Sequence, residues 1–141
     1  NWNRIYGRKG FVQYQFVLPK DQSREGLVRI LERIHARGWG SFLAVLKLLG
    51  PQGGPLCFPM EGYTLALDFP MRQGLLPFLD ELDELVVSFG GRLYLIKDAR
   101  MSRGMFEHTY PQAGAFKEQL RTWDPQGRFR SLLTDRLGIT S

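Results

Sequence analysis

The sequence has little of what disulfides, metal sites and membrane spans require. A single cysteine, Cys57, excludes an internal disulfide and fits a reducing compartment. The two histidines, His35 and His108, lie far apart and offer no zinc-like ligand spacing, so we expect no metal site. No apolar run approaches the ~20 residues that a membrane-spanning helix needs, so we expect no transmembrane segment.

The sequence also lacks the short motifs by which many enzymes are recognised. Its glycine-rich stretch, Gly50 to Gly54, matches neither the P-loop nor the GxGxxG pattern. No Ser-His-Asp or Cys-His arrangement can be argued, and Cys57, between two apolar residues, is more typical of a small buried group than of a nucleophile. Function must therefore be argued from the fold and from the polar residues that it presents.

The composition is that of one ordinary globular domain. The chain has 141 residues, of which 43% are hydrophobic and 23% charged, with a net charge of +5. The basic excess is spread along the chain, which permits contact with a phosphate-bearing ligand or an acidic surface without requiring either. Residues 1–9 are polar and aromatic and do not begin with Met, and we expect them to be an N-terminal segment leading from another part of a longer protein.

Hydrophobic periodicity predicts a sheet domain over residues 10–100. The expected order is strand, helix, strand, strand, helix, strand, which is an α+β, ferredoxin-like βαββαβ unit with an antiparallel sheet and both helices on one face. Asp21 and Ser23 are candidate N-caps of the first helix. We expect the acidic residues Asp80, Glu81, Asp83 and Glu84 to form a solvated flank of the second helix. The expected elements are Gly10–Leu18, Asp21–Arg37, Ser41–Leu49, Gly62–Phe69, Gln73–Phe89 and Gly91–Lys97.

Residues 101–141 are predicted to be a mainly helical tail. Three helices are expected, over Ser102–Thr109, Ala113–Thr122 and Arg128–Leu137. The tail is too polar to form a core of its own. It should therefore either wrap the sheet unit or reach a neighbouring part of the protein.

Strand parity indicates that the sheet face without helices is a docking surface. This face would carry polar residues beside three that are too apolar for bare water, Phe11, Val17 and Ile96. Lys97 lies three residues after Tyr94, so the two cannot share a face of a regular strand. Either Lys97 has left the strand or a bulge turns its side chain. The polar residues expected on this face are Gln13, Gln15, Thr64, Asp68 and Tyr94.

Two features of this surface have both a structural and a functional interpretation. The glutamines Gln13 and Gln15 are typical of a solvated strand face, but amides that donate and accept also suit a polar pocket. Lys47 interrupts an otherwise apolar strand, and it either extends to solvent at a sheet edge or faces a ligand. The loop from Gly50 to Glu61 is longer than a hairpin needs, and long ordered loops are often functional.

Several motifs, in this order along almost the whole chain, resemble the C-terminal, substrate-binding portion of bacterial FAD-linked oxidases of the vanillyl-alcohol oxidase type. The resemblance implies that FAD is bound by an N-terminal domain outside these residues, that 10–100 is the substrate-binding domain, and that 101–141 packs back on the FAD domain. The motifs are Gln13–Pro19, Ser41–Lys47, Pro55–Pro70, Gly90–Arg100, Asp124-Pro125 and Arg136–Gly138.

The resemblance also implies residue roles. Tyr94 matches a tyrosine that approaches the flavin ring, and Lys97 matches a lysine that reaches flavin and substrate at the reaction centre. Gln15, Lys47 and Thr64 match residues of the substrate pocket. The implied reaction is hydride transfer from a sugar or polyol carbinol carbon to flavin N5, with a polyprenyl-phosphoryl sugar of the cell envelope (arabinan metabolism) as the favoured substrate. A cation at that centre would stabilise developing negative charge.

Further expectations follow from the same resemblance. The isolated chain should neither retain FAD nor turn over, its uncovered sheet face could pair two copies, and the full-length parent could work with an NAD(P)-dependent reductase. The expected location is cytoplasmic, or peripheral to the inner membrane or on its periplasmic face. Departures from the family pattern bear on the substrate: Ala66 stands for a cysteine, Thr64 for an asparagine, Ala99 for a serine and Leu132 for an aspartate.

Two alternatives come from other classes of protein. A ferredoxin-like sheet with positive charge could be an RNA-recognition module, but the Gly91–Lys97 strand has one tyrosine and no RNP1-type pattern, so we expect no nucleic-acid partner. The other alternative is a stand-alone ferredoxin-like interaction domain. An upstream FAD domain in the full-length parent sequence would decide against it.

Overall fold

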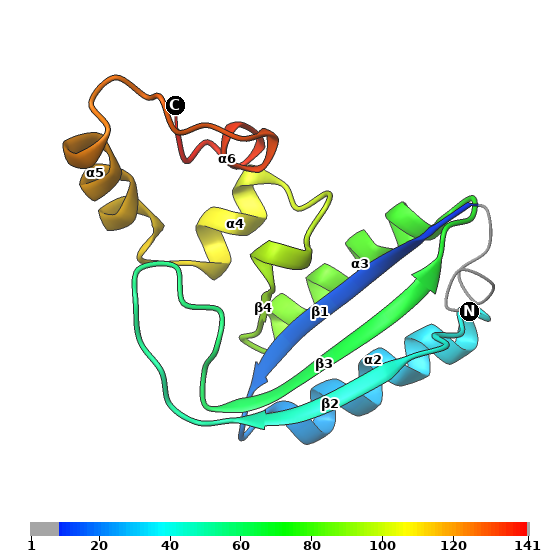
Figure 1. The fold of residues 1–141 in the computed structure, drawn as a ribbon. Helices are drawn as coiled ribbons and strands as arrows, with labels where there is room; N and C mark the ends of the chain where they lie inside the picture. The colour runs from blue at the N-terminus through cyan, green and yellow to red at the C-terminus, as the bar shows by residue number, and fades with distance from the viewer. Residues whose placement is uncertain (1–8, 141) are drawn as a thin grey trace.

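The computed structural model describes residues 9–140, and it confirms the predicted α+β arrangement. Four strands form an antiparallel sheet in the order β2-β3-β1-β4, with α2 and α3 on one face (Figure 1). The predicted packing of Trp2, Ile5 and Tyr6 lies outside the described residues. The elements of the sheet unit are β1 Phe11–Pro19, α2 Ser23–Ala36, β2 Ala44–Leu49, β3 Gly62–Pro70, α3 Leu75–Ser88 and β4 Arg92–Leu93.

The centre of the sheet is the long pairing of β1 with β3. It runs without interruption from Phe11 opposite Pro70 to Pro19 opposite Gly62. Alternate residues of both strands point to the helices, as the period-2 pattern predicted, and most of them are almost fully buried. On β3 the residues of the opposite face are buried as well: Thr64, Ala66 and Asp68. The apolar side chains that point to the helices and the apolar stripe of α3 form the core: Phe16, Leu18, Leu65, Leu67, Phe69, Leu75, Leu79, Leu82 and Val86.

The helices begin and end close to the predicted positions, but the N-cap predictions for α2 were wrong. Gln22 holds the N-cap position without a side-chain cap. The hydroxyl of Ser23 instead donates to the carbonyl oxygens of Leu18 and Pro19, at 3.0 and 2.7 Å, and so joins the helix to the end of β1. At the end of α3 the chain turns through Gly90, with φ of +71°, into Gly91, where a Cβ would lie 2.5 Å from the carbonyl oxygen of Val17.

The fourth strand is much shorter than predicted. Only Arg92 and Leu93 pair with β1, and the chain then turns into the 3-10 helix η1, Leu95–Lys97. Of the two alternatives for Lys97, the first is therefore correct: Lys97 has left the strand. The prediction that Ile96 lies in the sheet face was wrong, because its side chain is 80% exposed on η1.

The tail packs against the sheet unit and shares its core. It contains α4 Arg103–Thr109, α5 Ala113–Trp123 and α6 Leu132–Arg136, so the last helix is shorter than the predicted Arg128–Leu137. A capping box between Ser131 and Thr134 starts α6 only at residue 132. Within residues 9–140, no helix is long and apolar enough to cross a membrane. The tail residues buried in the common core are Met101, Phe106, Tyr110, Ala113, Leu137 and Ile139.

Candidate functional site

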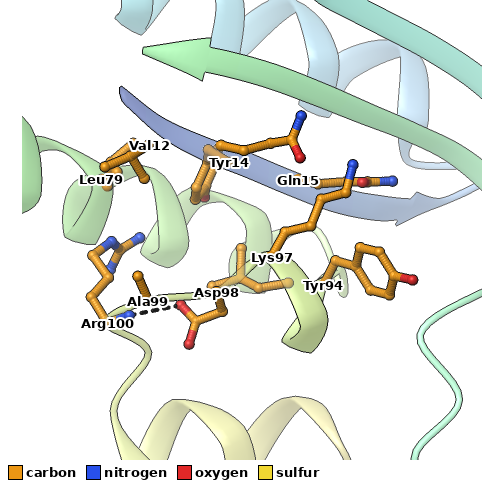
Figure 2. Close-up of a pocket in the computed structure, with 11 residues that line it drawn as sticks. Val12, Tyr14, Gln15, Leu79, Tyr94, Lys97, Asp98, Ala99 and Arg100 are labelled. Atoms are coloured by element: carbon orange, nitrogen blue, oxygen red, sulfur yellow. Dashed lines mark hydrogen bonds between the residues drawn. The ribbon is translucent and has the colours of Figure 1, made fainter. Parts of the chain in front are cut away.

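The 3-10 turn at η1 aims Lys97 at the sheet face that α2 and α3 leave open. The Tyr94 N–H donates to the Gln15 carbonyl oxygen at 2.9 Å, which extends the pairing with β1 by one bond. The Lys97 N–H then donates to the Tyr94 carbonyl oxygen at 3.1 Å and closes the turn. In Figure 2 the Lys97 side chain extends towards the strand that carries Gln15, with the Tyr94 ring beside it.

A ladder of polar side chains crosses the open face from β1 to β3. Gln13 Nε2 donates to Asp68 Oδ1 at 2.9 Å, and Gln15 Nε2 donates to Thr64 Oγ1 at 3.0 Å. The Thr64 hydroxyl in turn donates to the Phe16 carbonyl oxygen at 2.8 Å. Thr64 and Asp68 are each only 2% exposed, so these hydrogen bonds fix buried groups.

The structure brings most of the predicted site residues together. Gln15, Tyr94 and Lys97 line one small pocket, and Thr64 adjoins it through its hydrogen bond to Gln15. Lys47 lies directly opposite Thr64 on the edge strand β2, exposed and outside the pocket lining. The enclosed space is about 10 Å³, which is room for one water. A larger ligand would therefore lie over the pocket, across the open face.

Two cations at the end of this segment have opposite surroundings. The half-buried Lys97 ammonium makes no hydrogen bond or ion pair with any residue from 9 to 140. Three positions later, the Arg100 guanidinium is bound by Asp83 through two nitrogens, at 2.7 and 2.8 Å, and also by Asp80. Because Arg100 is satisfied within the chain and Lys97 is not, Lys97 is the cation available to an outside group.

The carboxylate that holds Arg100 corrects the prediction for the second helix. Asp83 is not part of a solvated flank: it is 3% exposed and also accepts a hydrogen bond from the Tyr14 hydroxyl at 2.9 Å. Burial raises the pKa of Asp83, and the ion pair with Arg100 opposes that rise. Burial and then the neighbouring Asp83 charge raise the pKa of Tyr14 well above its usual value, so Tyr14 remains a neutral donor.

Asp98 ties the site to the tail. Its Oδ1 accepts from the backbone N–H groups of Arg100 and Met101, at 3.1 and 2.9 Å (the first is drawn in Figure 2). Its Oδ2 accepts from Arg136 at 2.9 Å, and Arg136 also donates to the Met101 carbonyl oxygen. Asp98, directly after Lys97, is thus held in place, while the Lys97 ammonium has no partner among residues 9–140.

The long loop contributes a second wall. The Phe58 ring lies 4.5 Å, centroid to centroid, from the Tyr94 ring, and the Cys57 carbonyl oxygen accepts from Arg92 at 2.8 Å. Beyond Tyr94 opens an apolar groove of about 600 Å³ between this loop, η1 and the tail, lined by residues such as Ile96, Phe116 and Phe129. Tyr94 therefore stands between a polar pocket and an apolar groove. Among residues 9–140 no group of His, Cys, Asp and Glu could hold a metal ion.

Sequence reasoning missed two parts of this site. The first is the Tyr14–Asp83–Arg100 network, for which a signal existed: residue 83 lies four after Leu79 and three before Val86, on the buried stripe of α3. The second is the pairing of Gln13 with Asp68. It depends on the β1–β3 register, which single-strand patterns leave undetermined.

Comparison with known proteins finds relatives that are much longer than this chain. No family model matches the chain. It is 44% identical over 139 residues, 98% of its length, to decaprenylphosphoryl-beta-D-ribose oxidase of Mycolicibacterium smegmatis, and 37% identical over 116 residues to the "Uncharacterized protein in mprA 5'region" of Streptomyces coelicolor. The chain spans 30% and 31% of the lengths of these relatives. The chain is therefore similar over almost its whole length to a C-terminal portion of this oxidase, which confirms the resemblance that its motifs predicted.

Proposed function

We propose that the chain is the substrate-side portion of an FAD-dependent oxidoreductase that oxidises a hydroxyl group of a sugar or polyol. The observation that carries the proposal is Lys97, a half-buried cation without a partner in the described chain, beside the amide and aromatic side chains of Gln15 and Tyr94. The similarity to an oxidase named for decaprenylphosphoryl-β-D-ribose favours a polyprenyl-phosphoryl sugar as substrate.

The residues at the pocket fit one edge of a flavin. An unpaired ammonium suits the electron-rich edge of the ring or the oxygen of the substrate, and the Tyr94 ring supplies an apolar neighbour. FAD, when bound, would accept the hydride from the substrate carbon. The chain offers no glycine-rich phosphate loop, so a separate FAD domain would hold the rest of the cofactor.

The residues of the chain have distinct roles in this proposal. Lys97 stabilises negative charge that develops as the hydroxyl is oxidised. Gln15, which the buried Thr64 holds in position, orients the sugar across the open face. Lys47, at the sheet edge, attracts a phosphate or another anionic group of the substrate. The hydrogen bonds of Asp98 and Arg100 keep the lysine backbone in place.

Strongly exposed apolar side chains support a missing domain as the partner of the tail. The apolar side chains of Ile96, Trp123, Phe129 and Leu132 are between 67% and 91% exposed. We propose that they pack on the FAD domain of the full-length parent. The open face of the isolated chain would then favour a homodimer that the parent does not form.

The test compares the full-length parent with the 141-residue chain. The purified parent should contain stoichiometric FAD, which decaprenylphosphoryl-β-D-ribose should reduce, and an added electron acceptor should reoxidise the flavin and allow turnover. The isolated chain should contain no flavin and show no turnover. Stoichiometric FAD with turnover in the isolated chain would overturn the assignment to a portion of an enzyme, and a parent without flavin would overturn the oxidoreductase assignment.

A further inference from the structure

Two glutamines on the open face are held in the same way. Gln13 and Gln15 are two residues apart on β1, and each turns its amide nitrogen towards β3, to Asp68 and Thr64 respectively. Both glutamines line the pocket that Lys97 enters, and both are half-buried. Because both amide nitrogens are already bound to β3, the two glutamines can offer a ligand only their side-chain carbonyl oxygens.

The chemistry of their partners fixes the orientation of both amides. A carboxylate only accepts hydrogen bonds, so Gln13 must turn its NH₂ group to Asp68. The Thr64 hydroxyl hydrogen is committed to the Phe16 carbonyl oxygen, so Thr64 can only accept from Gln15. Each glutamine is therefore left with a carbonyl oxygen that accepts no hydrogen bond from residues 9–140, and neither oxygen is buried.

We propose that Gln13 is a second specificity residue, whose carbonyl oxygen, with that of Gln15, accepts hydrogen bonds from two hydroxyl groups of the sugar. The inference rests on the proposed function and adds to it which groups of the site donate and which accept hydrogen bonds. Lys97 only donates, and the two carbonyl oxygens only accept. A hydroxyl group both donates and accepts, so this set of groups selects polyhydroxylated ligands over ethers and deoxy compounds.

The spacing of the two acceptors favours hydroxyls on opposite sides of a sugar ring. Residues i and i+2 of a strand are about 7 Å apart along the chain. Adjacent hydroxyl oxygens lie much closer than this, so a single diol would engage only one amide. Asp68 acts as a positioning residue, because its bond to Gln13 prevents the amide from turning its NH₂ group to the ligand.

Enzyme kinetics with deoxy substrates test the proposal. In the FAD-loaded full-length parent, Gln13→Met should lower kcat/KM for decaprenylphosphoryl-β-D-ribose about tenfold, which is the loss of one hydrogen bond. For the deoxy analogue that lacks the hydroxyl bound by Gln13, the same variant should differ from wild type by less than about twofold. Gln22→Met, a glutamine just before α2 and outside the pocket, is the matched control and should change neither rate.

A second measurement needs no variant and no turnover. With ¹³C- and ¹⁵N-labelled glutamine in the parent, a substrate analogue whose reacting hydroxyl is replaced by hydrogen should shift the Gln13 and Gln15 side-chain carbonyl ¹³C resonances. Their NH₂ resonances should move little, because β3 continues to hold them. A large NH₂ shift with an unmoved carbonyl would overturn the acceptor role.

The outcomes separate this inference from the proposed function. Suppose that wild type turns over and that Gln13→Met lowers kcat/KM equally for the native sugar and for every deoxy analogue. Gln13 then binds no hydroxyl group, and the inference fails while the proposed function stands. If wild type does not turn over any polyprenyl-phosphoryl sugar, the proposed function and the inference fail together. A loss confined to the native sugar, together with the carbonyl shift, supports the inference.

Discussion

The two faces of the sheet differ in what covers them: helices cover one face, and the other carries polar groups that lack partners among the described residues. On the helix-covered face, side chains such as Phe16 and Phe69 are fully buried against α2 and α3. On the open face, Gln13 and Gln15 donate hydrogen bonds to β3, but their side-chain carbonyl oxygens accept none from the described residues. Lys97 also has no partner among the described residues. The difference supports the proposal that the second face binds a ligand, while the first face supplies folding stability. Variants on the two faces should therefore affect different measurements.

The largest loss of stability is expected on removing Arg100, which compensates the buried Asp83. Arg100→Met should lower the free energy of unfolding by about 3–5 kcal/mol, because it leaves a buried carboxylate unpaired. Chemical denaturation of the chain measures this. Arg37→Met removes an exposed pair with Glu81 and should cost less than about 1 kcal/mol. Equal losses in the two variants would contradict the assignment of Arg100 to the buried network.

The pH dependence of the same variant sharpens the comparison. Burial already raises the pKa of Asp83 above its ordinary value of 3.8, and loss of Arg100 removes the charge that opposes this rise. A raised carboxyl pKa favours the folded state at low pH and destabilises it as pH rises through the raised value. The deficit of Arg100→Met should therefore shrink as pH falls from about 7 towards about 4. A deficit that grows over this range would be the contrary result.

A core truncation on the helix-covered face is the next largest effect. Leu82→Ala should cost about 2–5 kcal/mol, because Leu82 is fully buried and its removal leaves a cavity. Leu76→Ala, the same change at a 40% exposed position of α3, is the control and should cost well under half as much. Thermal or denaturant unfolding of both variants compares them directly. Similar costs would show that α3 does not cover the sheet as described.

The Thr64 hydroxyl, on the sheet face that the helices leave open, should contribute less to folding stability than the Leu82 side chain. Thr64→Val keeps the side-chain shape but removes the bonds to Gln15 and to the Phe16 carbonyl oxygen, and should cost about 1–2 kcal/mol. It also frees the Gln15 amide to turn, so substrate KM in the parent should rise. Ala66→Ser, which adds a hydroxyl at a neighbouring buried position of β3, is the control for a change of polarity that does not touch the bonds of Thr64. A stability loss as large as that of Leu82→Ala would break the division between the two faces.

Local patterns predicted the sheet and the direction of most side chains. The alternation of β1 placed Phe16 towards the helices and Gln15 on the open face. Parity left two alternatives for Lys97, a departure from the strand or a bulge, and the structure shows the departure. These predictions follow from the period of the backbone, which a single segment carries. The length of β4 was not predictable in this way, because a 3-10 turn of apolar residues resembles a strand in sequence.

Long-range pairings were the part that the sequence could not predict. Asp83 meets Tyr14 and Arg100, which lie 69 and 17 residues away, and only the packing of α3 on β1 brings them together. The site residues Tyr94 and Lys97 came from motif resemblance, and the hydrogen bond from Tyr94 to Gln15 depends on the β1–β4 register. Their roles with flavin and substrate stay predictions.

The most direct test of this account is Lys97→Met in the full-length parent. In the isolated chain the variant should change the free energy of unfolding by less than about 0.5 kcal/mol, because Lys97 has no partner among residues 9–140. In the parent, FAD content should be unchanged while the single-turnover rate of flavin reduction by decaprenylphosphoryl-β-D-ribose falls about 10²–10³-fold. A rate within about twofold of wild type would remove Lys97 from the reaction centre and contradict the account.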